Sequence, residues 1–122
     1  MTADPSRPRR GRELLIEQAK LRVRQLRPQQ VRQWLGQGAL LLDLRAAEAF
    51  QQGHLLGAIW VDYLTLGATI DRLVPDFTRP IVCCSARGNR SALVAFQLQQ
   101  LGYWRVGSLR GGVEAWDRRL VK

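Results

Sequence analysis

The sequence predicts a single α/β domain built on a mostly parallel sheet. The chain has 122 residues, which is below the ~150 residues of a typical domain, so one domain is expected. Hydrophobic residues make up 46% of the chain and charged residues 24%, which excludes wholesale disorder. Short segments with strand character alternate with segments of helical periodicity over short connections, an order typical of parallel α/β sheets.

The expected elements follow one another in a regular order. Helices are expected at 13–26, 28–35, 46–52, 64–73, 91–101 and 113–120. Short strands are expected at 39–43, 59–61, 81–84 and 106–109, with a further edge strand near 24–27. Pro28 suits the first position of a helix, and Gly53 and Gly102 stand where two of the helices end. The segments at 39–43 and 81–84 are almost continuously apolar, which is typical of strands buried on both faces.

The net charge of +9 is concentrated at the start of the chain. Residues 1–32 hold nine Lys and Arg against three acidic residues, whereas residues 33–122 hold ten against seven. A basic arm suits nucleic acid or anionic lipid, but a solvated tail is the interpretation we favour. No aromatic residue interleaves the early arginines, so nucleic acid is not an expected partner. Residues 1–12, rich in Pro and Arg, are expected to be a disordered tail that is dispensable for chemistry.

Several other classes of protein do not fit the composition. No apolar run is long enough to span a bilayer, and the basic N-terminus leads into no apolar signal segment, so a membrane partner is not expected. The adjacent Cys83 and Cys84 do not form a disulfide framework. One histidine leaves little for a zinc site, so no metal or cofactor is expected. A reducing, cytoplasmic setting fits best.

The candidate site lies where the strand at 81–84 meets a loop of small and basic residues, 85–91. Ligands of open parallel sheets bind at the carboxyl ends of the strands. Gly88 lets the backbone curl so that successive N–H groups point inward, and the next helix adds its positive end. Such a cradle holds an oxyanion and lowers the pKa of a thiol at its floor, so Cys84 is expected to be a thiolate nucleophile. Arg87 and Arg90 would add charge, with Arg90 as the anion clamp. The plainer alternative is a structural cysteine before an ordinary loop.

Three stretches of the chain carry a resemblance to a known family. They are Asp43-x-Arg45 with Glu48-x-Phe50 and Gly53-His54-x-x-Gly57-Ala58, then Gly88-Asn89-Arg90-Ser91-Ala92, and finally Gly111-Gly112-x-x-Ala115-Trp116. In this order they resemble the rhodanese-like domain family, over about residues 26–120. The resemblance implies a three-layer α/β/α domain at 27–122 with a five-stranded, mostly parallel sheet. The helix at 13–26 is then an N-terminal extension that only some members share.

The resemblance also implies an activity. The catalytic cysteine of the family takes a sulfane sulfur from a donor such as thiosulfate, becomes a persulfide, and passes the sulfur to a thiophilic acceptor. We therefore predict a sulfurtransferase whose partners are a small anionic donor and an acceptor that is a small molecule or a protein thiol. Cys84 and Arg90 are its expected catalytic residues. The expected substrate-binding residues are Ser85, Ala86, Arg87, Gly88, Asn89 and Ser91.

The loop departs from the family's common pattern at the nucleophile. That pattern has four residues between the cysteine and the arginine, and counting back from Arg90 reaches Ser85 rather than Cys84. If the strand ends one residue early, Cys84 reaches the centre of a longer loop, which is the interpretation we favour. The longer spacing also resembles the loops of rhodanese-fold phosphatases and arsenate reductases. If Ser85 fills the cysteine position, the domain is a silent module that binds a partner or an anion.

The remaining candidates are interpreted as structural. His54, the only histidine, lies in the Gly-His-x-x-Gly-Ala stretch, where the family uses it structurally. Asp43 and Arg45 are expected to form a local ion pair. Cys83 should point to the opposite face of the sheet from Cys84. Core or half-buried positions are expected for the four tryptophans, Trp34, Trp60, Trp104 and Trp116.

Overall fold

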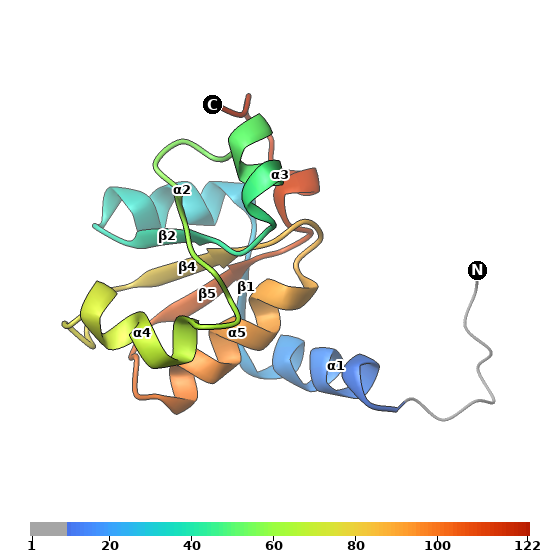
Figure 1. Ribbon diagram of the computed structural model, residues 1–122, viewed down its shortest axis with the longest axis vertical. Helices are drawn as coiled ribbons and strands as arrows, with labels where there is room; N and C mark the ends of the chain where they lie inside the picture. Colours follow the sequence, from blue (N-terminus) through green and yellow to red (C-terminus); the bar gives the residue numbers. More distant parts are fainter. Residues whose placement is uncertain (1–9) are drawn as a thin grey trace.

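The structure, a computed structural model, describes residues 10–122 (Figure 1). Five parallel strands form one sheet in the order β1-β5-β4-β2-β3. The strands are β1 (Arg24–Leu26), β2 (Leu40–Asp43), β3 (Ile59–Trp60), β4 (Ile81–Cys84) and β5 (Val106–Leu109). The helices are α1 (Arg12–Arg22), α2 (Pro28–Gly36), α3 (Ala47–Gln52), α4 (Leu66–Leu73), α5 (Asn89–Gln100) and a short 3₁₀ turn, η1 (Val113–Ala115). The predicted α/β class is confirmed. The first nine residues of the expected tail lie outside the described residues.

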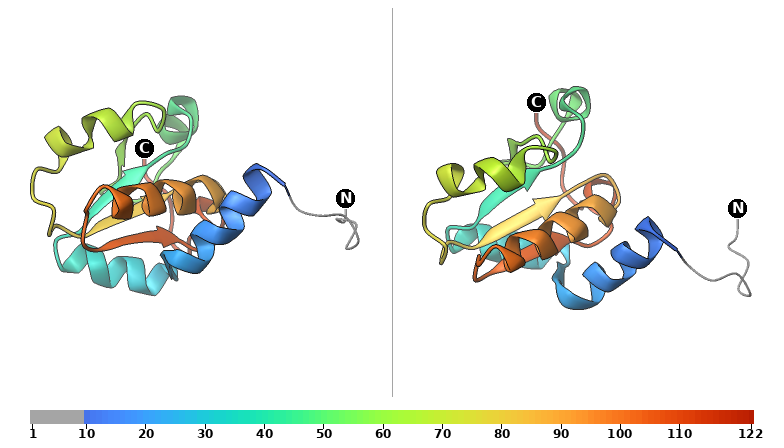
Figure 2. Two further views of the ribbon diagram at one scale, coloured as in Figure 1. Left: turned by 90° about the horizontal axis from the view of Figure 1, so that it is seen from below. Right: turned by 60° about the horizontal axis from the view of Figure 1, so that its bottom comes forward.

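Helices cover both faces of the sheet, which gives three layers (Figures 1 and 2). One core lies between the sheet and α1, α4 and α5, and the other lies between the sheet and α2, α3 and the segment after η1. Side chains of β4 alternate between them, because successive residues of a strand point to opposite faces. Cys83 belongs to the first core and Cys84 to the second, as expected from the sequence.

The carboxyl ends of β2, β4 and β5 meet at one edge of the sheet. Asp43 ends β2 beside Cys84, which ends β4, and the ladder continues because the Leu44 N–H donates to the Cys84 carbonyl at 2.9 Å. Leu109 ends β5, and the Arg110 N–H then donates to the Leu26 carbonyl of β1 at 2.8 Å. Parallel strands therefore deliver three loops to the same place, which is where α/β sheets bind ligands.

The prediction of a closing helix at 113–120 is wrong. Only Val113–Ala115 turns, as η1, and the chain then runs extended so that Val121 can pair with His54. The two residues exchange N–H to carbonyl bonds of 2.8 and 2.9 Å, which fixes the C-terminal segment against the end of α3. A long-range backbone pairing of this kind overrides a helical pattern of only eight residues.

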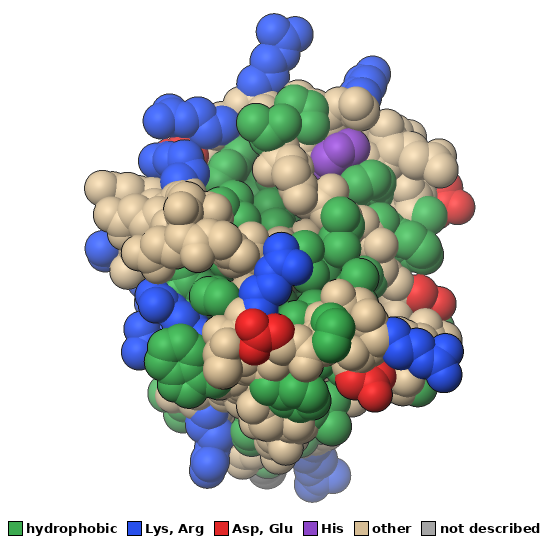
Figure 3. Space-filling model, turned by 90° about the vertical axis from the view of Figure 1, so that its left-hand side faces the viewer, with side chains coloured by type: hydrophobic (Ala, Val, Ile, Leu, Met, Phe, Trp, Pro, Cys, Tyr) green, Lys and Arg blue, Asp and Glu red, His purple; other side chains and the backbone are tan. Residues whose placement is uncertain are grey.

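Exposure corrects one further expectation. Trp104 is 71% exposed and Trp60 is 41% exposed, whereas Trp34 is buried and Trp116 half-buried, as predicted. The face in Figure 3 shows hydrophobic side chains interspersed with polar ones, while most of the Lys and Arg side chains project at the margin and one lies near the centre beside an acidic side chain. Within residues 10–122, the helices are all too short or too polar to cross a membrane.

Candidate functional site

The loop between β4 and α5 is closed on itself by serine hydroxyls. The Ser85 hydroxyl accepts a hydrogen bond from the Ser91 N–H at 3.1 Å and donates to the Ser91 hydroxyl at 3.0 Å. The Ser91 hydroxyl in turn lies 2.8 Å from the Ser108 hydroxyl of β5. All three side chains are buried. Ser85 is therefore the first residue of the loop, and its hydroxyl is held at the floor of the loop by Ser91 of α5, which in turn contacts Ser108 of β5.

Cys84 lies elsewhere. It is the last residue of β4, its side chain is fully buried in the core beneath α2, and it does not line the cleft above the loop. The expectation that β4 ends one residue early is wrong, and so is the expected lowering of the thiol pKa. Burial raises the pKa of the Cys84 thiol, and the nearby Asp43 and Cys83 raise it further, while Arg45 lowers it.

Above Ser85 the loop forms the wall of a cleft of about 460 Å³. The residues that line it come from α1, from the two segments that follow β2 and β4, and from the starts of α3 and α5: Arg12, Arg45, Ala49, Ser85, Ala86, Arg87, Asn89 and Arg90. Four of these eight side chains are arginines. Of the sequence-predicted site residues, Ser85, Ala86, Arg87, Asn89 and Arg90 line the cleft, whereas Cys84, Gly88 and the buried Ser91 do not.

The backbone of the loop offers free donors to this cleft. Within residues 10–122, the N–H groups of residues 86–90 donate no hydrogen bond. Gly88 has a φ of 93°, the left-handed conformation that lets the loop curl before α5 begins at Asn89. Successive N–H groups without partners, next to the positive end of a helix, favour an oxyanion; Ala86 and Arg87 are exposed, Gly88 is buried, and Asn89 and Arg90 are half-buried.

Two of the arginines are held in place by other groups. Arg90 stacks its guanidinium 3.9 Å above the centre of the Tyr63 ring and donates to the Leu44 carbonyl at 3.4 Å. Arg45 forms a two-point ion pair with the fully buried Asp43, as predicted, and also donates to the Gly53 carbonyl at 2.7 Å. Arg90 therefore brings a positioned, uncompensated charge, whereas the charge of Arg45 is largely neutralised.

Arg87 has a weaker position than predicted. Its side chain is exposed, and its nearest acidic partner is Glu114, with 3.9 Å between Nε and Oε2. Exposed pairs at this distance contribute little to stability and leave the side chain free to reorient. We therefore regard Arg87 as a peripheral charge at the mouth of the cleft.

The turn after β5 braces the loop. The Val113 N–H donates to the Ser85 carbonyl at 2.8 Å, and the Glu114 N–H donates to the Ala86 carbonyl at 3.1 Å. Gly112 makes this close approach possible, because a Cβ at this position would overlap the backbone of Ser85 and Ala86. The Gly-Gly pair seen in the sequence thus acts on the backbone of the loop.

The other sequence candidates are structural in this geometry. The Nδ1 of His54 lies 2.8 Å from the Phe50 carbonyl, and the imidazole stacks on the Phe50 ring at 3.8 Å between centres. Sequence reasoning missed Ser108, Tyr63 and Arg12. Ser108 lies near the carboxyl end of a parallel strand, a position that could have singled it out. Nothing in the local sequence of Arg12 or Tyr63 indicated the cleft.

Comparison with known proteins fits this fold. The family model of the rhodanese-like domain matches residues 27–119. The chain belongs to the rhodanese-like domain family. Its region outside the match includes all of α1.

Several solved structures are similar to this chain over most of its length. A Rhodopseudomonas palustris protein of unknown function, described as a possible tyrosine phosphatase, shares 22% identity over 93% of this chain and 94% of its own, with a TM-score of 0.79. An E. coli rhodanese with anions shares 27% identity over 69% of this chain and 98% of its own, with a TM-score of 0.62. A thiosulfate sulfurtransferase from Pseudomonas aeruginosa shares 27% identity over 77% of this chain, with a TM-score of 0.67, but the match spans only 18% of that protein.

Proposed function

We propose that this chain is a rhodanese-like module that binds an oxyanion in the loop 85–91 and forms no persulfide. The observation that carries the proposal is the hydroxyl of Ser85 at the floor of the loop, bonded to Ser91. Ser85 occupies the position of the family's catalytic cysteine, because the common loop of the family has four residues between that cysteine and its arginine, and four residues separate Ser85 from Arg90. The proposal therefore replaces the sulfurtransferase hypothesis that rested on Cys84.

The burial of Cys84 argues against persulfide chemistry. A thiolate must reach the sulfane sulfur of thiosulfate, form an S–S bond with it, and release sulfite with the electron pair of the broken bond. The Cys84 thiol has no exposed surface, and its pKa is raised rather than lowered, so little thiolate forms near neutral pH.

Ser85 does not replace the missing thiol. A serine hydroxyl attacks only when a positioned base removes its proton. The only histidine, His54, is engaged with the Phe50 carbonyl, and among residues 10–122 the Ser85 hydroxyl bonds only to the hydroxyl and the N–H of Ser91. The floor of the loop is therefore polar and uncharged, which suits binding better than nucleophilic attack.

Anion binding needs no thiol. The free N–H groups of residues 86–90 and the positioned guanidinium of Arg90 supply the donors for a tetrahedral oxyanion. The E. coli rhodanese at 27% identity was solved with anions, which is consistent with this use of the fold. We expect Arg90→Gln to weaken sulfate binding about tenfold, as loss of a charged hydrogen bond does.

The decisive experiment moves the thiol by one residue. Wild type, Ser85→Cys and Cys84→Ser are each incubated with thiosulfate and weighed by mass spectrometry, then treated with cyanide. We expect no adduct on wild type or on Cys84→Ser. Ser85→Cys should gain one cyanide-labile sulfur, ~32 Da, because the cradle lowers the pKa of a thiol at its floor.

Two outcomes would overturn the proposal. An adduct on wild type that disappears in Cys84→Ser would establish a sulfurtransferase that uses Cys84. Turnover of an aryl phosphate by wild type, lost in Cys84→Ser, would establish a phosphatase of the kind suggested for the Rhodopseudomonas palustris protein. Circular dichroism of each variant shows whether it is folded.

A further inference from the structure

The helix α1 lies outside the matched family region but packs firmly on the domain. Ala19 is fully buried and Val23, just after the helix, nearly so, both in the core that α1 shares with α5. Arg22 lies over the Phe96 ring of α5, 5.9 Å from its centre. Because its C-terminal half is anchored in this way, the other end of α1 is held at the start of α5, beside the loop (Figure 2).

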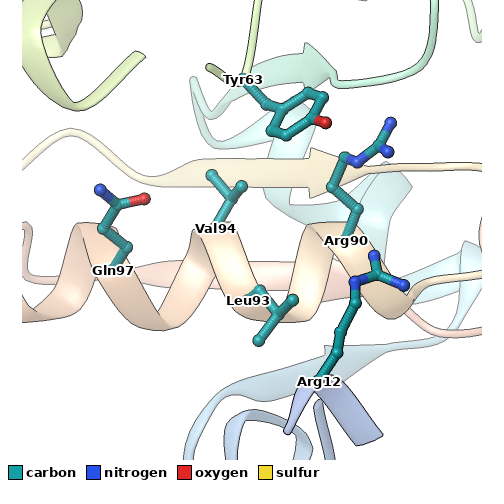
Figure 4. Close-up of a pocket in the computed structure, with 6 residues that line it drawn as sticks. All are labelled: Arg12, Tyr63, Arg90, Leu93, Val94 and Gln97. Carbon is teal, nitrogen blue, oxygen red and sulfur yellow. The ribbon is translucent and has the colours of Figure 1, made fainter. Parts of the chain in front are cut away.

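This packing brings Arg12, the first residue of α1, to the wall of the cleft. Arg12 lines the 460 Å³ cleft together with Arg90 and the loop. It also lines an adjoining cavity of about 310 Å³, which it again shares with Arg90. Figure 4 shows the two guanidinium groups reaching toward the same region from α1 and α5. The two cavities therefore meet at a pair of arginines.

The pair carries uncompensated charge. Among residues 10–122, no carboxylate lies within ion-pair distance of Arg12 or Arg90. Arg45 is neutralised by Asp43, and Arg87 has a distant partner in Glu114. Two neighbouring cations repel each other, and an anion with two negative charges between them relieves that repulsion.

The second cavity has a different character from the loop. Its remaining walls are the ring of Tyr63, the aliphatic side chains of Leu93 and Val94, and the amide of Gln97 (Figure 4). A bare oxyanion gains nothing from such a wall, whereas an organic group gains by burying its apolar surface there.

We propose that this site binds a phosphate monoester of a small organic group, with Arg12 as a binding residue supplied by the extension. A phosphate monoester carries about two negative charges near neutral pH. Its phosphoryl group lies in the loop between Arg90 and Arg12, and its organic group lies along Tyr63, Leu93 and Val94. The inference deepens the proposed function and rests on it, because the same loop holds the phosphoryl group. The proposal also changes the expectation that residues 1–12 are dispensable: only the residues before Arg12 are then dispensable for binding.

Calorimetric titration of the full chain with phenyl phosphate and with inorganic phosphate tests the proposal. We expect phenyl phosphate to bind more tightly than inorganic phosphate, and Arg12→Gln to weaken both about tenfold. The matched control is Arg72→Gln, which removes the same charge from the last turn of α4 and should bind as wild type. Leu93→Ser should reduce the preference for phenyl phosphate over inorganic phosphate without weakening the binding of inorganic phosphate.

Each alternative result has a definite meaning. If Arg12→Gln binds both ligands as tightly as Arg72→Gln does, while Arg90→Gln binds both about tenfold more weakly, the extension is not part of the site and the proposed anion-binding loop stands without it. If wild type binds inorganic phosphate as tightly as phenyl phosphate, the site is one for a free oxyanion and the ester proposal is overturned. If folded wild type binds neither ligand, both the ester proposal and the proposed anion-binding function fail.

Discussion

Replacing Gly112 with alanine should dislodge the anion-binding loop. Gly112 has φ 68° and ψ −162°, a conformation that residues with a side chain rarely adopt and that costs of the order of 1–3 kcal/mol. The new Cβ would also overlap the backbone of Ala86 and Ser85, which are held there by hydrogen bonds from Val113 and Glu114. Overpacking of this kind costs a further ~1–3 kcal/mol, so we expect a loss of about 3 kcal/mol in the free energy of unfolding.

Urea denaturation followed by circular dichroism measures this loss of stability. Calorimetric titration with sulfate measures the affinity of the loop for an anion. Sulfate binding by Gly112→Ala should fall at least as far as it does in Arg90→Gln, because the loop backbone carries the N–H donors. The matched control is Gly36→Ala in the last position of α2, where a Cβ meets nothing within 4 Å and the φ is not positive. That variant should be as stable as wild type or gain up to ~1 kcal/mol. A Gly112→Ala protein with wild-type stability and wild-type sulfate binding would refute the bracing role.

Three further predictions concern buried groups. Asp43→Asn should lower the free energy of unfolding by about 3 kcal/mol, because it leaves the largely buried Arg45 without its counter-charge. Asp117→Asn, which removes the acidic partner of a more exposed ion pair, should cost less than ~1 kcal/mol, and urea denaturation compares the two variants. Burial raises the pKa of Cys83 from 9.0 to about 12, and that of Cys84 is raised too, so the folded state holds both thiol protons more tightly than the unfolded state. The stability that this provides is complete below pH 9 and declines as the pH rises through 12, by up to ~1.4 kcal/mol per pH unit for each thiol. Urea denaturation at several pH values measures this decline, and the decline should be shallower in Cys84→Ala. Iodoacetamide at pH 8 should alkylate neither cysteine of the folded protein and both in urea, and rapid labelling of the folded protein would contradict the burial of Cys84.

Most of the sheet could be predicted because its strands are short and bounded. The segments at 81–84 and 106–109 agree with β4 and β5, and the edge strand expected near 24–27 is β1. Each is flanked by glycine, proline or a helix start, so its limits follow from local chemistry. The helical extension expected at 13–26 is wrong at its C-terminal end, because α1 ends at Arg22 and residues 24–26 pair with β5. The start of α5 was placed two residues late, because its first turn, Asn89 and Arg90, belongs to the loop motif in the sequence.

Elements that depend on distant partners could not be predicted in this way. The segment 113–120 has helical spacing, but its last residues are extended because the next residue, Val121, pairs with His54, which lies sixty-seven residues earlier in the chain. Arg12 is similar: its place at the cleft follows from the burial of Ala19 and Val23 against α5, and neither contact is visible in the local pattern. Tertiary context decides both cases.

The position of the nucleophile was the least predictable feature of the site. Cys83, Cys84 and Ser85 are all small enough to end a strand or begin a loop, so the sequence left open whether β4 stops before or after Cys84. Side chains alternate along a strand, and one residue of difference therefore moves a thiol from one face of the sheet to the other. What decides the register is remote: Asp43 pairs with Cys84 across the sheet, and Leu44 continues the ladder with a bond to the Cys84 carbonyl. Because β2 holds Cys84 in the strand, the alternation turns Ser85 toward Ser91, and the hydroxyl rather than the thiol reaches the floor of the loop.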